Sequence, residues 1–222
     1  AVTVVEKNAH LGGKMNVLEE QGFKFDMGPT ILTMPDVVRG IISRSGRRVQ
    51  DYLELVRLDP QWRCFYEDGT QIDLLSDVAA MKSAMNRQFP GAAVGEGWEK
   101  FVAWSRRMYS LSEKVFFYKD LEGISDLIRK PPPRGGGLMG DVLAMRMHST
   151  VAATAHRWIH EPHLRQLSEH FLQYVGSSPF LAPAILGLIA AAQVDHGCWY
   201  SMGGTRQVAK SLERILREEN AT

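Results

Sequence analysis

The sequence predicts a chain of the α/β plus α class, in which a strand-rich part is followed by a mostly helical part and then by a return to strand. Short runs with strand character fill residues 1–76, helical periodicity dominates residues 77–196, and strand character returns in residues 197–222. The 222 residues suffice for one large domain or two small ones. We therefore expect residues 1–76 to form the strand-rich part, residues 77–196 to form the mostly helical part, and residues 197–222 to return to the junction between them.

The first part of the chain is predicted to be rich in strands, at residues 2–6, 15–20, 22–26, 52–59, 62–66 and 71–74. The first is β-branched and apolar and ends in an acid, as a central parallel strand does. Residues 22–26 alternate apolar and polar with period two. Pro35 begins a helix that stops at Gly46, and an Asp-Gly turn joins the last two strands.

The second part is predicted to be helical, at residues 77–89, 96–117, 138–159, 162–174, 179–194 and 208–219. The run from Pro131 to Gly137 holds three prolines and three glycines and is therefore a loop or linker. Cys198 to Tyr200 read as a short strand that leads to Gly203 and Gly204 before the last helix.

Composition and charge narrow the function classes. Apolar residues make up 45% and charged residues 23%, which excludes a wholly disordered chain and a long coiled coil. Lys and Arg total 26 against 25 for Asp and Glu, so there is no basic excess and we expect no nucleic-acid partner. Cys64 and Cys198 form no CxxC pair, so neither a zinc site nor a disulfide framework is indicated and a reducing, cytoplasmic compartment is expected.

The ends of the chain suggest an internal fragment of a longer protein. There is no initiator Met, no basic and apolar leader precedes the first expected strand, and the last helical run stops at Asn220 to Thr222. We therefore expect part of the fold to be missing.

The strand at residues 2–6 and the glycines after it are typical of a Rossmann-like fold. An acid at the end of the second strand of such folds accepts hydrogen bonds from the ribose, about 20 residues after the glycine fingerprint. Glu6 has this position, and Gly12 and Gly13 let the backbone approach a phosphate to which Lys14 adds charge. An ordinary strand, a solvated Glu and a turn explain the same residues.

A longer set of motifs resembles one group of flavoproteins. Glu6-Lys7, Leu11-Gly-Gly-Lys14 and Gly22-Phe-Lys-Phe-Asp-Met-Gly-Pro-Thr30 are similar to the FAD-dependent amine oxidase and carotenoid desaturase superfamily. Further blocks resemble the bacterial phytoene desaturase branch: Arg57 to Tyr66, Glu67-Asp-Gly69, His163-Leu-Arg165, Gly176 to Phe180 and Gly197 to Thr205. The resemblance covers essentially the whole chain. It departs at Lys14, where Arg is commoner, and at Ser201-Met202, where Pro-Arg is commoner.

The resemblance implies an FAD-dependent oxidoreductase that removes hydrogen from a long polyene such as phytoene. It implies that residues 1–76 belong to an FAD-binding Rossmann-like domain that lacks its first strand. It also implies that residues 77–196 form a helical, membrane-facing substrate domain that interrupts it, and that residues 197–222 return to the junction of the two. FAD would accept the hydride, and a quinone or dioxygen would reoxidise it. The implied cofactor-binding residues are Glu6, Gly12, Gly13, Lys14, Gly28, Pro29, Gly203 and Gly204. The alternatives are a carotenoid isomerase or saturase of the same superfamily, and a non-catalytic helical module that binds membranes.

Two residues of the helical part are candidates for catalysis. Arg165 matches an arginine position of the desaturases, and Glu161 lies near their acidic residues. Either side chain has the chemistry to stabilise a cationic transition state or to shuttle a proton. A surface pair between them is the structural alternative.

A polyene offers no charge to grip, so its site should be an apolar tunnel. Candidate tunnel residues, with core packing as the alternative, are Phe101, Trp104, Phe116, Phe117, Trp158, Phe171, Phe180 and Leu181. The uncharged run from Phe180 to Val194 is too short to span a bilayer, so we expect a buried helix or a peripheral membrane contact. Phe116 and Phe117 beside Lys114 and Lys119 suit the same contact.

Four histidines of the helical part invite a metal hypothesis. His156, His160 and His163 have helical spacing and His170 follows, but Pro162 interrupts the helix and no Asp or Cys stands at ligand spacing. We therefore expect no metal site.

Overall fold

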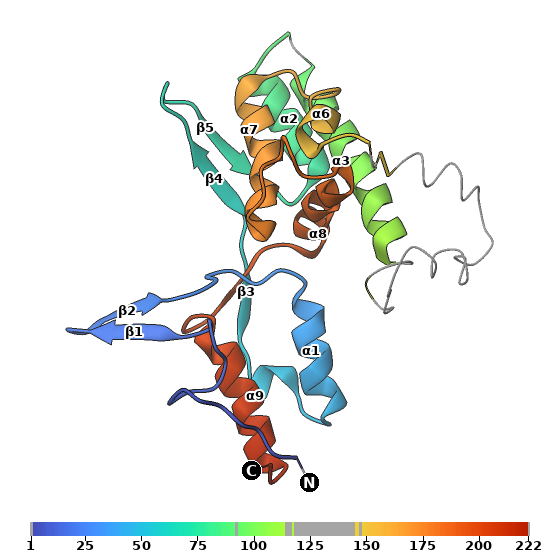
Figure 1. Cartoon of the computed structure of the whole chain (residues 1–222). Coiled ribbons are helices and arrows are strands. Elements are labelled where there is room, and N and C mark those ends of the chain that lie inside the picture. Colours follow the sequence, from blue (N-terminus) through green and yellow to red (C-terminus); the bar gives the residue numbers. More distant parts are fainter. Residues whose placement is uncertain (1, 92, 114–116, 118–144, 147, 222) are drawn as a thin grey trace, which may run out of the picture. The chain divides into compact units, whose positions relative to one another are not determined.

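The computed structural model describes residues 2–91, 93–113, 117, 145–146 and 148–221. The chain divides into two compact units (Figure 1). Unit 1 combines residues 1–59 with residues 196–222, and unit 2 consists of residues 60–195. The two ends of the chain therefore build one unit, and the middle builds the other.

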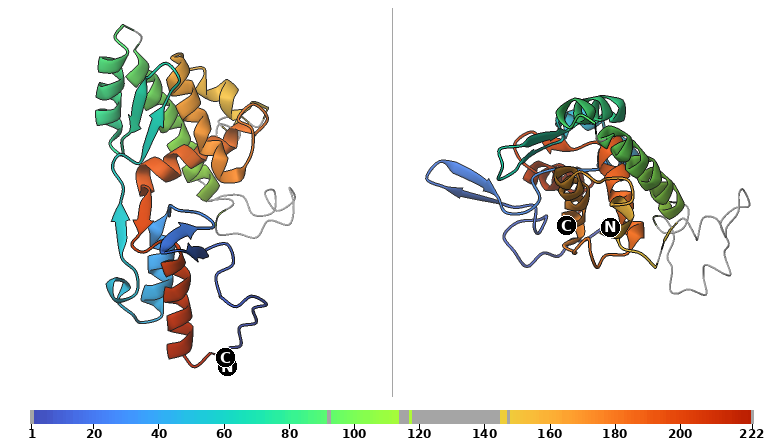
Figure 2. Two further views of the ribbon diagram at one scale, coloured as in Figure 1. Left: turned by 90° about the vertical axis from the view of Figure 1, so that its left-hand side faces the viewer. Right: turned by 90° about the horizontal axis from the view of Figure 1, so that it is seen from above.

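Unit 1 contains two antiparallel strand pairs and two helices. Its elements are β1 (Val17–Glu20), β2 (Phe23–Asp26), α1 (Pro35–Arg44), the 3₁₀ turn η1 (Val49–Asp51), β3 (Leu55–Arg57), β6 (Trp199–Ser201) and α9 (Arg206–Glu218). β1 pairs with β2, and β3 pairs with β6. The β1–β2 hairpin turns at Gln21 and Gly22, which both have positive φ, and it projects from the helices of the unit (Figures 1 and 2).

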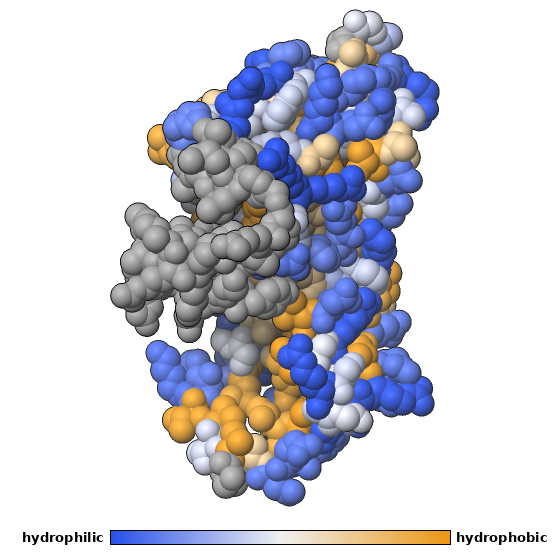
Figure 3. Space-filling model, turned by 90° about the vertical axis from the view of Figure 1, so that its right-hand side faces the viewer, coloured by the Kyte–Doolittle hydropathy of each residue, from blue (hydrophilic) through white to orange (hydrophobic). Residues whose placement is uncertain are grey.

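The core of unit 1 is small. It consists of Ile42, Leu53, Val208 and Ile215, so that α1, the η1 turn and α9 share one apolar contact. Other apolar side chains of the unit reach the surface near the chain ends (Figure 3), where Val2 and Val5 are 60% and 91% exposed.

The strand predicted at residues 2–6 is wrong for this structure. These residues are exposed and lie outside all three two-stranded sheets that the described residues form. A parallel strand exists only with a hydrogen-bonding neighbour, and β-branched composition alone does not supply one. The Rossmann-like sheet therefore stays a prediction for this chain.

Unit 2 packs a hairpin against helices (Figure 2). Its elements are β4 (Trp62–Phe65), β5 (Gln71–Leu74), α2 (Val78–Gln88), α3 (Val94–Ser112), α6 (Val151–Ala155), α7 (Pro162–Glu169), the 3₁₀ segments η3 (His170–Val175) and η4 (Ala184–Gly187), and α8 (Leu188–His196). α2 begins as predicted, because the Asp77 carboxylate accepts a hydrogen bond from the Ala80 amide at 2.8 Å.

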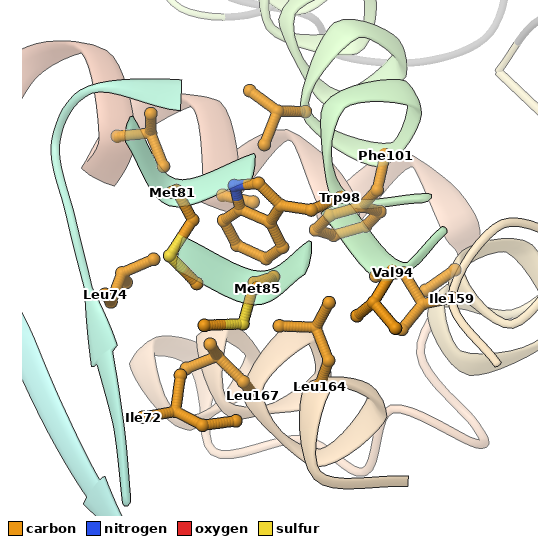
Figure 4. Packing of buried hydrophobic residues seen from close by; sticks show 14 of the residues in the cluster. Ile72, Leu74, Met81, Met85, Val94, Trp98, Phe101, Ile159, Leu164 and Leu167 are labelled. Carbon is orange, nitrogen blue, oxygen red and sulfur yellow. The ribbon is translucent and has the colours of Figure 1, made fainter. Parts of the chain in front are cut away.

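The core of unit 2 explains why its boundary lies at residue 60 and not at the predicted 76. Ile72 and Leu74 of β5 are fully buried and point into the same cluster as Met81, Trp98 and Leu164 (Figure 4). The β4–β5 hairpin thus buries its apolar face on α2, α3 and α7, and burial of such side chains is the main stabilising term in folding.

Several helices are shorter than their periodicity predicts. α7 gives way to a 3₁₀ segment after Glu169, and the apolar run predicted to be helical over 179–194 becomes an α-helix only from Leu188. Pro179 and Pro183 lack the amide hydrogen that a helix interior needs, which accounts for the delayed start. Of the helix predicted over 138–159, the described residues show α6 alone, and residues 131–137 lie outside them.

Candidate functional site

Three glycine-containing segments that the sequence assigns to cofactor binding meet at the start of α9 in unit 1. The Arg206 guanidinium donates a hydrogen bond to the carbonyl of Leu11. The Thr205 hydroxyl donates one to the carbonyl of Pro29 at 2.6 Å. Residues around 11–15, 28–29 and 203–206 are therefore tied together, although almost 200 residues separate the first from the last.

Glycine is required at two positions in these segments, because the backbone there packs too closely against a neighbouring segment to leave room for a side chain. A Cβ on Gly12, which has φ +100°, would lie 2.5 Å from the Cβ of Ala209. A Cβ on Gly28 would lie 2.2 Å from the carbonyl oxygen of Lys14. These distances are far below van der Waals contact, so a side chain at either position would force the segments apart. We call the three joined segments, around residues 11–15, 28–29 and 203–206, the glycine frame.

A cavity of about 480 Å³ opens beside the glycine frame. Its lining residues are Asn16, Val17, Glu19, Lys24, Asp26, Tyr200, Gly203, Gly204, Arg206, Gln207 and Lys210. All of them belong to unit 1. Three cations and two carboxylates face a wall of bare glycine backbone, and this combination suits a ligand that carries both phosphate and hydroxyl groups.

The hairpin supplies the cavity with alternating side chains. Val17 pairs with Asp26 and Glu19 with Lys24 across the strands, so these four residues share one face, and this face lines the cavity. The Lys24 ammonium is 3.1 Å from the Glu19 carboxylate, and both side chains are well exposed. Asp26 also approaches the glycine wall, because a Cβ on Gly204 would lie 2.7 Å from its Oδ1.

The other predicted cofactor residues lie differently. Gly13, with φ +56°, has open space around its Cα, and Lys14 contributes its carbonyl to the glycine frame. Glu6 is exposed, and its Oε1 accepts hydrogen bonds from the Asn8 backbone amide at 2.9 Å and side-chain amide at 2.8 Å. The Asn8 backbone bond is the main reason that the pKa of Glu6 is lowered. The role of Glu6 in binding ribose stays a prediction.

Sequence reasoning missed four cavity residues. These four are charged residues among the nine lining residues to which the sequence assigns no role: Lys24 and Asp26 stand inside the motif around Gly22 to Thr30, Arg206 precedes the predicted terminal helix, and Lys210 lies in it. The two hairpin residues were detectable, because alternation places them on one face. The position of Arg206 and Lys210 depends on a contact between distant segments.

The predicted catalytic pair lies in unit 2, around the start of α7. Glu161 is the N-cap, and its Oε2 accepts a hydrogen bond from the Leu164 amide at 2.6 Å. The Arg165 guanidinium donates from Nε to the carbonyl of Ile159 at 2.9 Å. These contacts give both residues a structural role, and their catalytic role stays a prediction.

The histidines are paired with carboxylates or with backbone. His156 Nε2 lies 2.6 Å from Glu169, and His170 Nδ1 contacts the carbonyl of Leu167. His156, His160 and His163 do not share one helix, because α6 ends at Ala155 and α7 begins at Pro162, the residue predicted to interrupt the helix. Within the described ranges no three His, Cys, Asp or Glu residues are arranged to hold a metal ion.

The predicted tunnel residues divide into core and surface. Phe101 and Phe171 are buried. Trp104 and Trp158 lie at the edge of the same core, with their ring centroids 6.0 Å apart and their planes tilted by 42°. Phe180 and Leu181 are 60% and 81% exposed. Phe116, Lys114 and Lys119 lie outside the described residues. A search of the described part of the chain finds no helix with the length and apolarity needed to cross a bilayer.

Curated proteins with related sequences come from carotenoid metabolism. The chain is 32% identical over 218 residues to a 4,4'-diapolycopene oxygenase of Methylomonas sp, with 98% of this chain and 42% of the relative covered. It is 34% identical to the 4,4'-diaponeurosporene oxygenase of Staphylococcus haemolyticus, with 98% of this chain and 42% of the relative covered. It is also 34% identical to the 4,4'-diaponeurosporene oxygenase of Staphylococcus aureus, with 100% of this chain and 43% of the relative covered. The chain thus spans less than half the length of these relatives.

A solved structure shares the fold. A protein of Pyrococcus furiosus matches with a TM-score of 0.55 and 18% identity, over 97% of this chain and 43% of that protein. At this identity the similarity concerns the arrangement of helices and strands alone.

A protein family matches almost the entire chain. Its description, flavin containing amine oxidoreductase, applies to residues 1–221. The match confirms the resemblance to the amine oxidase superfamily inferred from the sequence motifs, and flavin is the cofactor that the family's description names. The glycine frame and the cationic cavity beside it are compatible with that cofactor. The chain belongs to the flavin containing amine oxidoreductase family.

Proposed function

We propose that this chain is part of an FAD-dependent oxidoreductase that removes hydrogen from a long polyene such as phytoene. The observation that carries the proposal is the glycine frame, which joins three predicted cofactor segments beside a cavity of about 480 Å³ in unit 1. The family match and the carotenoid names of the relatives support the same function. We further propose that unit 1 is the part of a Rossmann-like domain that helical unit 2 interrupts.

The residues of the frame would bind and position the cofactor. Lys24, Lys210 and Arg206 provide positive charge for phosphates, and Asp26 provides an acceptor for hydroxyl groups. Gly203 and Gly204 leave backbone exposed where a side chain would block approach. Glu6 would accept hydrogen bonds from the ribose after releasing Asn8. When bound, FAD supplies the hydride acceptor for the dehydrogenation.

The names of the relatives favour a second candidate reaction, the oxygenation of a polyene. The three relatives are named oxygenases of diapolycopene or diaponeurosporene, and the chain shares about a third of its residues with each. Isomerisation and saturation of a carotenoid remain alternatives within the superfamily, and a quinone or dioxygen is the proposed electron acceptor.

The proposed protein is cytoplasmic and contacts the membrane peripherally, because its substrate dissolves in lipid. Phe180 and Leu181 are the support for this part of the proposal, since most of the run from Ala182 to Val194 is buried. Exposed apolar tips of this kind insert into the boundary between headgroups and acyl chains. A non-catalytic module that binds membranes would show this contact without flavin chemistry.

The experiment supplies the protein with FAD and with liposomes that contain phytoene or diaponeurosporene, and it analyses the products under isotopically heavy dioxygen. Dehydrogenation yields a product with more conjugated double bonds and no heavy oxygen. Incorporation of heavy oxygen supports the second candidate, and an unchanged conjugation with altered geometry supports isomerisation. A protein that binds no flavin at any length up to that of the relatives would contradict the proposal.

A further inference from the structure

A histidine of unit 2 lies between two carboxylates that come from different elements. His163, in the first turn of α7, places Nδ1 2.7 Å from Oε1 of Glu161. Its Nε2 lies 2.9 Å from Oδ2 of Asp68. Glu161 caps the same helix, whereas Asp68 stands in the turn between β4 and β5. One imidazole ring therefore bridges the start of a helix and the end of a hairpin.

The bridge forms the wall of a cavity of about 440 Å³, which is separate from the glycine frame and belongs entirely to unit 2. Its lining residues are Phe65, Tyr66, Glu67, Asp68, His163 and Gln166. The His163 ring meets the edge of Tyr66 at a centroid distance of 4.5 Å and stacks on Phe89 at 6.1 Å. These aromatic contacts fix the plane of the imidazole, so both of its nitrogens keep their direction.

Among the described residues, the charged groups in contact with the imidazole are acidic. Glu161 comes from the start of α7 and Asp68 from the hairpin turn, where Glu67 lines the same cavity. Tyr66, the remaining titratable neighbour, has its pKa raised chiefly by burial, so its hydroxyl is neutral near pH 7. Phe89, from the end of α2, adds no charge. The surroundings therefore favour the protonated ring.

The protonation state decides how many contacts the ring can make. A neutral imidazole carries one N–H and donates to one carboxylate, while the imidazolium donates to both. The hydrogen bond to Glu161, followed by the attraction of Glu161 and Asp68, raises the pKa of His163 above its ordinary value. A raised pKa in the folded state means that the stabilisation is complete at low pH and is lost as the pH rises through that pKa.

The two contacts differ in how easily each is lost. Glu161 is 9% exposed and also caps α7 through the Leu164 amide, so it keeps its place. Asp68 is 55% exposed, and its other oxygen accepts a hydrogen bond from the Thr70 amide at 2.9 Å within the turn. Water can replace His163 at Asp68, which leaves the turn without this tie to the start of α7. Deprotonation should therefore break the contact between elements and spare the local one.

We propose that His163 is a pH-dependent latch, which ties the β4–β5 turn to the start of α7 when protonated and releases the turn when neutral. The Tyr66 hydroxyl donates to the carbonyl of His163 at 2.8 Å and does not titrate in this range, so it keeps the end of β4 in place. Release is thereby confined to residues 67–69, which border the cavity. The latch controls access to this cavity, whose border is released as the pH rises through the pKa of His163.

The test measures the imidazole signals of the histidines by NMR between pH 5 and 9, together with amide hydrogen exchange of Gly69 and Thr70. We expect His163 to titrate above the ordinary histidine pKa. The exchange of both amides, divided by their intrinsic rates, should rise at least about threefold as His163 loses its proton. Asp68→Asn keeps the turn acceptor for Thr70 and should lower the pKa of His163 by about half a unit or more.

Two further variants make the outcome decisive. Glu169→Gln removes the partner of His156, a comparable pair in the same unit, and should leave the titration of His163 unchanged. Tyr66→Phe removes the non-titrating tether, and it should enlarge the pH dependence of exchange in the turn. The latch is refuted if Asp68→Asn leaves the titration of His163 as in the wild type, or if turn exchange follows the intrinsic rate across the titration.

Discussion

Replacing Gly28 with Ala should open the glycine frame. The backbone continues the β1–β2 pairing here, because the Met27 amide donates to the carbonyl of Asn16 at 2.8 Å. Gly28 then lies against Lys14, where a Cβ would be 2.2 Å from the carbonyl oxygen. Ordinary carbon–oxygen contact needs about 1 Å more. Gly28 does not have a positive φ, so the whole effect of the substitution is steric.

Overpacking by the added methyl group should lower the free energy of opening of this part of unit 1 by about 1–3 kcal/mol. The opening should accelerate amide exchange in residues 15–28 by about 5- to 150-fold, which hydrogen-exchange mass spectrometry resolves. Exchange in α3 of unit 2 is the internal reference. If flavin binds at the frame, the same variant should also weaken FAD binding, measured by flavin fluorescence.

Gly40→Ala is the matched control. Gly40 lies inside α1, where the nearest atom to an added Cβ is Arg44 Nη2 at 3.7 Å. Alanine is favoured over glycine in a helix by about 1 kcal/mol, so this variant should stabilise α1. The close approach of Gly28 to Lys14 would be refuted if residues 15–28 exchanged in Gly28→Ala as they do in the wild type, while Gly40→Ala behaved as stated.

Three other predictions follow from the same structure. Gly97→Ala would place a Cβ 2.1 Å from the carbonyl of Trp158, so it should lower the stability of unit 2 by about 1–3 kcal/mol in urea denaturation, despite its better helix propensity. Glu6→Ala should weaken FAD binding roughly tenfold in a protein that binds FAD, measured by fluorescence titration, and an unchanged affinity would show that Glu6 serves only its turn with Asn8. Replacing Phe180 and Leu181 together with Ser should reduce sedimentation with anionic liposomes while far-UV circular dichroism stays unchanged, and full sedimentation of the variant would place any membrane contact elsewhere.

The sequence predicts secondary structure and turns correctly where residues close together in the chain determine them. Period-two alternation indicated β2, Pro35 marked the start of α1, and an Asp-Gly turn joined β4 to β5. Asp77 was placed at the beginning of α2, where it is the N-cap. Each of these features depends on residues within one turn or one hairpin, so the sequence alone carries the information.

Features that depend on distant partners were not predictable in the same way. The strand expected at residues 2–6 needs neighbours that its own composition does not provide, and the boundary near residue 60 is set by burial of Ile72 and Leu74 against helices far along the chain. The glycine frame lies between these cases. Its motifs suggested a common role, but the contacts of Arg206 with Leu11 and of Thr205 with Pro29 are needed to show that the segments meet.

The register of the β1–β2 hairpin connects the chemistry of the cavity with the surface of unit 1. Val17, Glu19, Lys24 and Asp26 line the cavity, while the alternate positions Leu18 and Phe25 pair on the opposite face and are about half exposed. Because side chains alternate, a slip of one residue would turn apolar side chains into the cavity and its charges out. The positive-φ turn at Gln21 and Gly22 fixes the register at one end of the hairpin, and the close contact of Gly28 with Lys14 fixes it at the other. Gly28 therefore determines which residues face the cavity, although it is not part of the lining.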